Sequence, residues 1–202
     1  MIFRNRNKSK GNFLYGRRIG VLGLGPRVGT THISIAIANT LSEYGKMKVL
    51  LLEENRHDDI GALTLSLGAK GKDTPFPFHR VTYIPRAPFQ ERGELKDMDY
   101  DCMVSDLGSD FKSGLSRIML YDIKILVGTE GAWRSSEYDK LENITSGSEV
   151  LGSWRLFINL GNPKKLKEKD GLGFTTCCFP FEPDPVYPGD DTIKFIREAI
   201  YG

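Results

Sequence analysis

The chain has 202 residues, enough for one domain with its own hydrophobic core. Hydrophobic residues make up 40% and charged residues 27%, which argues against a wholly disordered chain, and there is no run of 18 apolar residues that could cross a bilayer as a helix. The net charge is only +2, the N-terminus lacks the apolar stretch of a secretory signal, and the three cysteines show neither a disulfide framework nor a metal-ligand spacing. We therefore predict a cytoplasmic globular protein.

Positive charge is concentrated at the N-terminus. Six of the 28 Lys and Arg residues lie in residues 1–18, which contain no acidic residue, so the rest of the chain has 22 basic against 26 acidic residues. We interpret residues 1–17 as a basic arm and residues 18–202 as a single domain. The arm is either simply solvated or makes weak contact, through residues 1–18, with an anionic membrane surface, which would place the protein at the inner face of the membrane. The acidic remainder predicts no specific nucleic-acid binding.

Short apolar runs alternate with segments of helical periodicity along the chain. They predict strands over 19–24, 48–52, 80–84 (after a proline-rich turn), 102–105, 123–127, 154–160 and 174–178, and helices over 31–44, 111–121, 136–141 and 191–200. Continuous apolar runs are typical of parallel strands that are covered on both faces. The prediction is an α/β fold, a doubly wound and mostly parallel sheet between two helical layers, with ligands beyond the carboxyl ends of the strands.

A glycine-containing loop, GLGPRVGTTH, joins the first predicted strand to the first predicted helix. Glycines let backbone N–H groups approach an anion closely, and a helix N-terminus attracts negative charge. The candidate phosphate-binding residues are Gly25, Pro26, Arg27, Val28, Gly29, Thr30, Thr31 and His32. Such a loop also fits a capped turn without a ligand, or a stretched dinucleotide-binding turn with Glu53 as the ribose acid.

An acid, Asp106, directly follows the apolar strand predicted over 102–105. P-loop NTPases hold an aspartate at this place, where it orients magnesium and its bound water. The same residue could instead cap a helix that begins near Ser109.

At this point the sequence resembles the MinD/ParA group of deviant P-loop ATPases and, within it, Tad-pilus localisation proteins of the TadZ/CpaE type. The matching stretches span most of residues 19–185 in the family's order: RVGTTHISIAIANTLSEYGKMKVLLLEEN, YDCMVSDLGSD, IKILVGTEGAW, RLFINLGNP and CCFPFEPDP. The resemblance implies a P-loop NTPase-like domain that binds ATP or ADP with Mg²⁺. It places Thr31 and Asp106 at the metal, and Asn159 and Pro180 at the base.

The chain departs from the family where catalysis depends on charge. The family loop reads Lys-Gly-Gly-Val-Gly-Lys-Thr-Thr, so Gly25 and Thr30 stand where lysines belong, and Arg27 is the only cation in the loop. Asn55 stands where the family has the aspartate that positions the attacking water. Losing one preorganised group of this kind costs about 10²–10³ in rate. We therefore predict no catalytic residue and at most weak ATP hydrolysis.

The resemblance implies a MinD/ParA-like regulatory or scaffold protein, a homodimer that helps to place or assemble a pilus or secretion apparatus through an unknown protein partner. Three alternatives remain open. One is a scaffold that has lost the nucleotide. The second is an NAD(P)-dependent oxidoreductase, favoured by Gly23, Gly25 and Glu53 but without a Tyr-x-x-x-Lys pair. The third is a DNA-partitioning ATPase, favoured by the basic arm and disfavoured by the acidic remainder.

Overall fold

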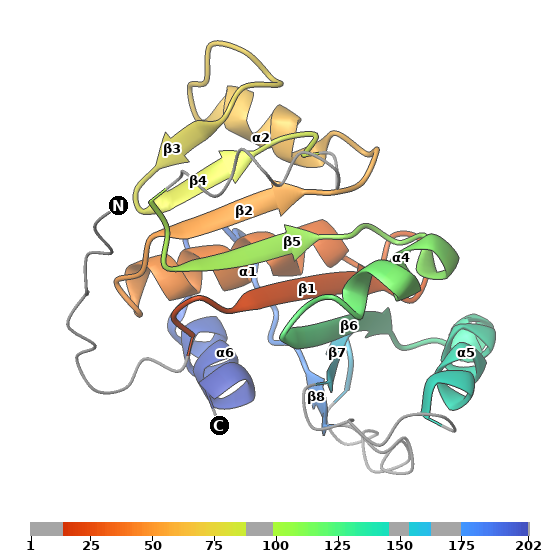
Figure 1. Cartoon of the computed structure of the whole chain (residues 1–202). Coiled ribbons are helices and arrows are strands. Elements are labelled where there is room, and N and C mark those ends of the chain that lie inside the picture. Colours follow the sequence, from red (N-terminus) through yellow and green to blue (C-terminus); the bar gives the residue numbers. More distant parts are fainter. Residues whose placement is uncertain (1–13, 88–98, 146–153, 163–174, 202) are drawn as a thin grey trace, which may run out of the picture.

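A single sheet of eight strands organises the chain (Figure 1). The computed structural model describes residues 14–87, 99–145, 154–162 and 175–201. The strands are β1 (Arg18–Gly23), β2 (Val49–Glu53), β3 (Phe76–Phe78), β4 (Val81–Ile84), β5 (Cys102–Asp106), β6 (Ile123–Thr129), β7 (Trp154–Asn159) and β8 (Thr175–Cys178). Their order is β3-β4-β2-β5-β1-β6-β7-β8, and every pair is parallel except β3 with β4. The predicted doubly wound, mostly parallel sheet is confirmed.

Helices cover both faces of this sheet. They are α1 (Thr30–Glu43), α2 (Asp59–Ser66), α4 (Phe111–Ile118), η2 (Ala132–Arg134), α5 (Ser135–Thr145) and α6 (Asp190–Tyr201). One core cluster joins Ile37 of α1 and Ile196 of α6, and a second, on the opposite face, joins Ile118 of α4 and Leu141 of α5. None of these described helices combines the length and the apolar character needed to cross a membrane.

The central strand shows why continuous apolar runs mark this fold. In β1, Ile19 and Val21 belong to the core cluster under α1, whereas Leu22 belongs to the cluster under α4. Successive side chains of a strand point to opposite faces, so a strand covered on both sides needs apolar residues at nearly every position.

The register places two chemically important strand ends side by side. β1 pairs with β5 so that Val21 lies opposite Asp106. The loop that follows β1 therefore leaves the sheet next to Asp106, at the carboxyl edge where α/β folds bind ligands.

Three elements were not predicted from the sequence, and one of them is the short 3-10 helix η2 (Ala132–Arg134). Residues 59–66 form the helix α2, and residues 76–78 form the short strand β3 rather than only a turn. β3 runs antiparallel to β4 at the edge of the sheet. Pro77 is tolerated there because an edge strand leaves one side of its backbone without ladder hydrogen bonds.

The chain enters the domain at the opposite, amino-terminal edge of the sheet (Figure 1). Leu14 is fully buried, and the Gly16 N–H donates to the Asp101 carbonyl at 2.7 Å, just before β5 begins. The backbone N–H of Arg18 donates to the Asp122 carboxylate at 2.8 Å. The end of the predicted arm is thus fixed to the domain, while residues 1–13 lie outside the described part.

Candidate functional site

In the loop between β1 and α1, residues with a left-handed backbone conformation alternate with residues in ordinary conformations. Arg27 (φ 59°) and Gly29 (φ 90°) are left-handed, whereas Pro26 and Val28 are not. Alternation of this kind turns successive backbone N–H groups toward one concave side, which is how protein loops bind anions. α1 begins at Thr30, so its N-terminus adds a favourable dipole at the same place.

A cavity of about 440 Å³ lies against this loop, and we call it the loop cavity. It is lined by Pro26, Arg27, Val28, Gly29, Thr30, Thr31, His32, His57, Asp59, Gly108 and Ser109. Seven of the predicted phosphate-binding residues therefore meet at one cavity. Gly25, Asn159 and Pro180 do not line it.

Thr31 and Asp106 are in direct contact at this site. The Thr31 hydroxyl donates to Asp106 Oδ2 at 2.7 Å, and the Gly108 N–H donates to Asp106 Oδ1 at 3.0 Å. Burial raises the pKa of Asp106 to about 6, although the hydrogen bond from Thr31 opposes this shift. The alternative role of Asp106 as a helix cap is wrong, because Asp110 caps α4 by accepting from the Ser113 N–H at 3.4 Å.

A second carboxylate, which the sequence did not single out, lies beside this pair. Asp59 Oδ2, at the start of α2, is 3.4 Å from the Thr31 hydroxyl. The hydroxyl and carboxylate oxygens of Thr31, Asp59 and Asp106 are the hard donors that Mg²⁺ prefers. Among the described residues, no group of three His, Cys, Asp or Glu could hold a metal by itself. A magnesium ion would therefore need further oxygen ligands, which the phosphates of a nucleotide and water can supply.

The two positions that carry lysines in the resembling family are filled differently here. The Thr30 hydroxyl is buried and has no hydrogen-bond partner among the described residues. It lies so close to Gly23 that a Cβ there would be 2.4 Å from Thr30 Oγ1. At position 25, the carboxylate of Glu137 occupies the space that a side chain would need, since an added Cβ would be 2.1 Å from Glu137 Oε1.

The acidic end of β2 faces away from the loop cavity. Glu53 is fully buried, and its Oε1 accepts the Ile60 N–H of α2 at 3.0 Å, so it is not open to a ribose. Asn55 donates to the Asp106 carbonyl at 3.3 Å and accepts the His57 N–H at 2.8 Å. Neither Glu53 nor Asn55 lines the loop cavity.

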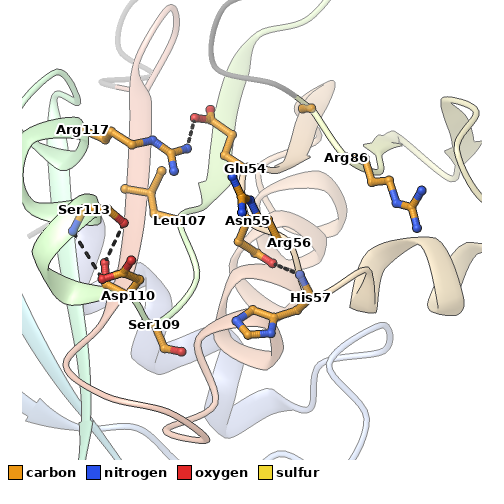
Figure 2. A pocket seen from close by; sticks show the side chains of 11 residues that line it. Glu54, Asn55, Arg56, His57, Arg86, Leu107, Ser109, Asp110, Ser113 and Arg117 are labelled. Atoms are coloured by element: carbon orange, nitrogen blue, oxygen red, sulfur yellow. Dashed lines mark hydrogen bonds and ion pairs between the residues drawn. The ribbon is translucent and has the colours of Figure 1, made fainter.

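Asn55 lines instead a second cavity of about 920 Å³ (Figure 2). Buried Glu54 lies at this second cavity and accepts three hydrogen bonds: from Arg117 Nη2 at 2.6 Å, Tyr121 Oη at 2.7 Å and Ser105 Oγ at 2.9 Å. His57 and Ser109 line both cavities. No pattern along the chain indicated this network, because its members are far apart in the sequence.

The residues predicted at the base follow the carboxyl ends of β7 and β8. Asn159 ends β7, and its side-chain amide donates to the Val28 carbonyl at 3.0 Å. Pro180 is half-buried two residues after β8. Trp133 in η2 is 80% exposed and therefore does not belong to the core.

No protein-family model and no curated protein match the chain. Solved structures match it over nearly its whole length. A plasmid partition protein from Borrelia burgdorferi B31 bound to AMPPNP is 17% identical and has a TM-score of 0.64, with 92% of this chain and 96% of that chain covered. A ParA family ATPase from Chlorobium tepidum TLS is 15% identical (TM-score 0.58; 90% and 97% covered), and MinD in the MinC:MinD complex of Aquifex aeolicus is 15% identical (TM-score 0.64; 92% and 96% covered).

The chain has the fold of ParA and MinD ATPases. At this level of identity the likeness establishes the fold alone. Within the ParA/MinD fold of this chain, the glycine-containing loop and Thr31 line one cavity, and Thr31 contacts buried Asp106, whereas the family's lysines are replaced and Asn55 lines the neighbouring cavity.

Proposed function

We propose that the loop cavity binds the phosphates of ATP or ADP together with Mg²⁺. One observation carries this proposal: the Thr31 hydroxyl lies 2.7 Å from buried Asp106, at a cavity lined by the alternating loop and the start of α1. Backbone N–H groups can neutralise phosphate oxygens there without a lysine. Thr31 and Asp106 would hold the metal, and Asp59 is a further donor within reach.

We also propose that bound ATP is hydrolysed weakly or not at all. Phosphoryl transfer depends on positioned charges around the transferred group. Thr30 supplies no charge where a lysine is expected, and Asn55 is held by Asp106 and His57 outside the loop cavity. The nucleotide would act as a regulatory ligand that changes the conformation of the protein, not as a source of energy through its hydrolysis.

In the cell, we propose a MinD/ParA-like regulatory or scaffold protein of the TadZ/CpaE type. It would act at the cytoplasmic side as a homodimer that recruits components of a pilus or secretion apparatus. The sequence resemblance supports this role, and the solved complex of MinD with MinC supports a protein partner for the fold. The basic residues of the arm support a weak contact with the membrane surface.

Calorimetric titration with ATP, ADP and NAD, with and without Mg²⁺, tests the nucleotide proposal. We expect ADP and ATP to bind and to raise the melting temperature, since a ligand at 100 times its Kd adds about 2.7 kcal/mol to the free energy of unfolding. Thr31→Ala should abolish the Mg²⁺-dependent part of the affinity, while Thr74→Ala, at an exposed position in the turn before β3, is the matched control.

The other outcomes identify the alternatives. Silence toward all three ligands would favour a scaffold without nucleotide. A response to NAD alone would favour the dinucleotide-dependent enzyme, which buried Glu53 argues against. Rapid release of phosphate from ATP would contradict the weak-hydrolysis proposal.

A further inference from the structure

Two carbonyl groups of the loop are held from outside the loop cavity. Arg134 Nη1, in η2, donates to the Pro26 carbonyl at 3.1 Å. Asn159 Nδ2, at the end of β7, donates to the Val28 carbonyl at 3.0 Å. Neither Arg134 nor Asn159 lines the loop cavity. We call these two side chains the loop clasp.

Holding a carbonyl group also fixes the direction of the next N–H group. In a planar trans peptide, the C=O and the N–H point in opposite directions. Because Arg134 and Asn159 draw the carbonyls of Pro26 and Val28 outward, the N–H groups of Arg27 and Gly29 face the opposite side, toward the loop cavity. These two residues are also the left-handed ones, at φ 59° and 90°.

Asn159 of the clasp and Glu137, the partner of Arg134, explain two glycines in the loop. A Cβ at Gly29 would lie 2.2 Å from Asn159 Nδ2. A Cβ at Gly25 would lie 2.1 Å from Glu137 Oε1, and Glu137 in turn accepts from Arg134 Nη1 at 2.5 Å. Asn159 therefore packs where a side chain at position 29 would stand, and Glu137, which accepts from Arg134, packs where a side chain at position 25 would stand. This arrangement also accounts for the absence of a lysine at position 25.

We propose that Arg134 and Asn159 are positioning residues that preorganise the loop amides for a diphosphate or triphosphate chain. The inference deepens the proposed function and depends on it for the identity of the ligand. Preorganised N–H groups need no rearrangement when the anion arrives, so they contribute binding that the missing lysines would otherwise supply. Asn159 acts through Val28 in this proposal and contacts the phosphate chain only indirectly.

Inorganic pyrophosphate separates this role of Asn159 from recognition of the base. Pyrophosphate has the phosphates of ADP but neither sugar nor base. We expect Asn159→Ala to weaken ADP and pyrophosphate by the same factor, about 10-fold, because each lost hydrogen bond leaves one loop amide free to turn. A loss confined to ADP would overturn the positioning role of Asn159 and assign it to the base.

Arg134 is tested with a graded series. Arg134→Ala should weaken both ligands about 10-fold, and Arg134→Lys should retain most of the affinity because an ammonium can still donate to the Pro26 carbonyl. Arg134→Ala/Glu137→Ala removes both charges, so no carboxylate is left buried without a cation. Arg80, which donates to the Lys46 carbonyl at 3.0 Å before β4 begins, provides the matched control Arg80→Ala. Unchanged affinity in the Arg134 variants would overturn the positioning role of Arg134.

Hydrogen exchange of the loop amides gives a readout that needs no ligand. The amides of residues 27–29 should exchange about 10-fold faster in Arg134→Ala and Asn159→Ala than in the wild type and in Arg80→Ala. Equal exchange in all four proteins would overturn the clasp even if nucleotide binds. If the wild type binds neither ADP nor pyrophosphate, the proposed function fails, and faster exchange would still support the clasp as a device that holds the loop.

Discussion

The two neighbouring cavities are built on different principles. The loop cavity presents backbone groups and the start of a helix, and the Thr31 hydroxyl at its wall contacts Asp59 and buried Asp106. The second cavity presents side chains that already bind one another, above all Glu54 with Arg117. Groups that are satisfied internally stabilise a structure, whereas converging backbone N–H groups are available to a ligand. We therefore propose that the loop cavity binds the ligand and that the network at the second cavity stabilises the fold.

The largest effect should come from the network at the second cavity. Glu54→Ala removes the acceptor shared by Arg117, Tyr121 and Ser105, and breaking a buried pair of this kind costs about 3–5 kcal/mol. We expect urea unfolding to show this loss, and Glu43→Ala, at an exposed glutamate of α1, to show almost none. A loss below about 1 kcal/mol would mean that the network does not stabilise the domain.

The pH dependence of stability should reveal the buried carboxylate of Asp106, which contacts Thr31. Burial raises the pKa of Asp106 from 3.8 to about 6, so the folded state holds this proton more tightly than the unfolded chain does. Its contribution to folding is present below about pH 4 and is lost as the pH rises through about 6, a change of about 3 kcal/mol. Unfolding measured at several pH values should show this decline in the wild type.

Asp106→Asn serves as the reference for that experiment, because an amide does not titrate in this range. Its unfolding free energy should lack the decline between pH 4 and pH 7. If the wild type and Asp106→Asn followed the same pH profile, Asp106 would not be the group with the raised pKa. Added Mg²⁺ and nucleotide should reduce the decline, since the proposed metal favours the ionised carboxylate.

An intermediate effect should follow from Gly29→Ala. A non-glycine residue in the left-handed region costs about 1–2 kcal/mol, and here its Cβ would also collide with Asn159. We expect a lower melting temperature and loss of ADP binding. Gly68→Ala is the control, because Gly68 has a φ of 103° with no atom within 4 Å of an added Cβ. Equal effects of the two substitutions would show that the contact with Asn159 is unimportant.

The smallest predicted effect is a gain. Thr30→Lys introduces the cation that the resembling family has at this position, and one charge near a phosphate should improve ADP affinity about 10-fold. Titration against the wild type measures it, with Ser66→Lys, exposed at the end of α2, as a variant of equal net charge. Equal affinities in the two variants would show that the loop cavity does not receive the phosphates.

Sequence patterns predicted the parallel sheet well because each central strand needs apolar residues on both faces. The strands β1 and β2 follow this rule, with Leu51 and Leu52 belonging to core clusters on opposite faces. The missed strand β3 has only three residues, Phe-Pro-Phe, and its central proline is more typical of a turn. The missed helix α2 has eight residues with a glycine at its third position, too short for a clear helical period.

For the site, the sequence predicted the residues of the loop but not the residues that hold it. The loop is contiguous, so glycine spacing and the start of α1 were visible in one segment. Arg134, Glu137 and Asp59 lie in the helices η2, α5 and α2, and no pattern along the chain marks their role at the site. Asn159 was singled out for the base by resemblance, whereas its observed contact is with the loop.

The buried Leu14 fixes the direction in which the basic arm meets the domain. Leu14 and the hydrogen bond from Gly16 to Asp101 hold the end of the arm at the amino-terminal edge of the sheet. The Thr31–Asp106 pair lies at the carboxyl-terminal edge, so the length of β1 separates the two places. If the basic arm bound an anionic surface, the amino-terminal edge of the sheet would face that surface. The carboxyl-terminal edge, with the loop and its cavity, would then face away from it. Tethering and ligand exchange could then proceed together without competing for the same space.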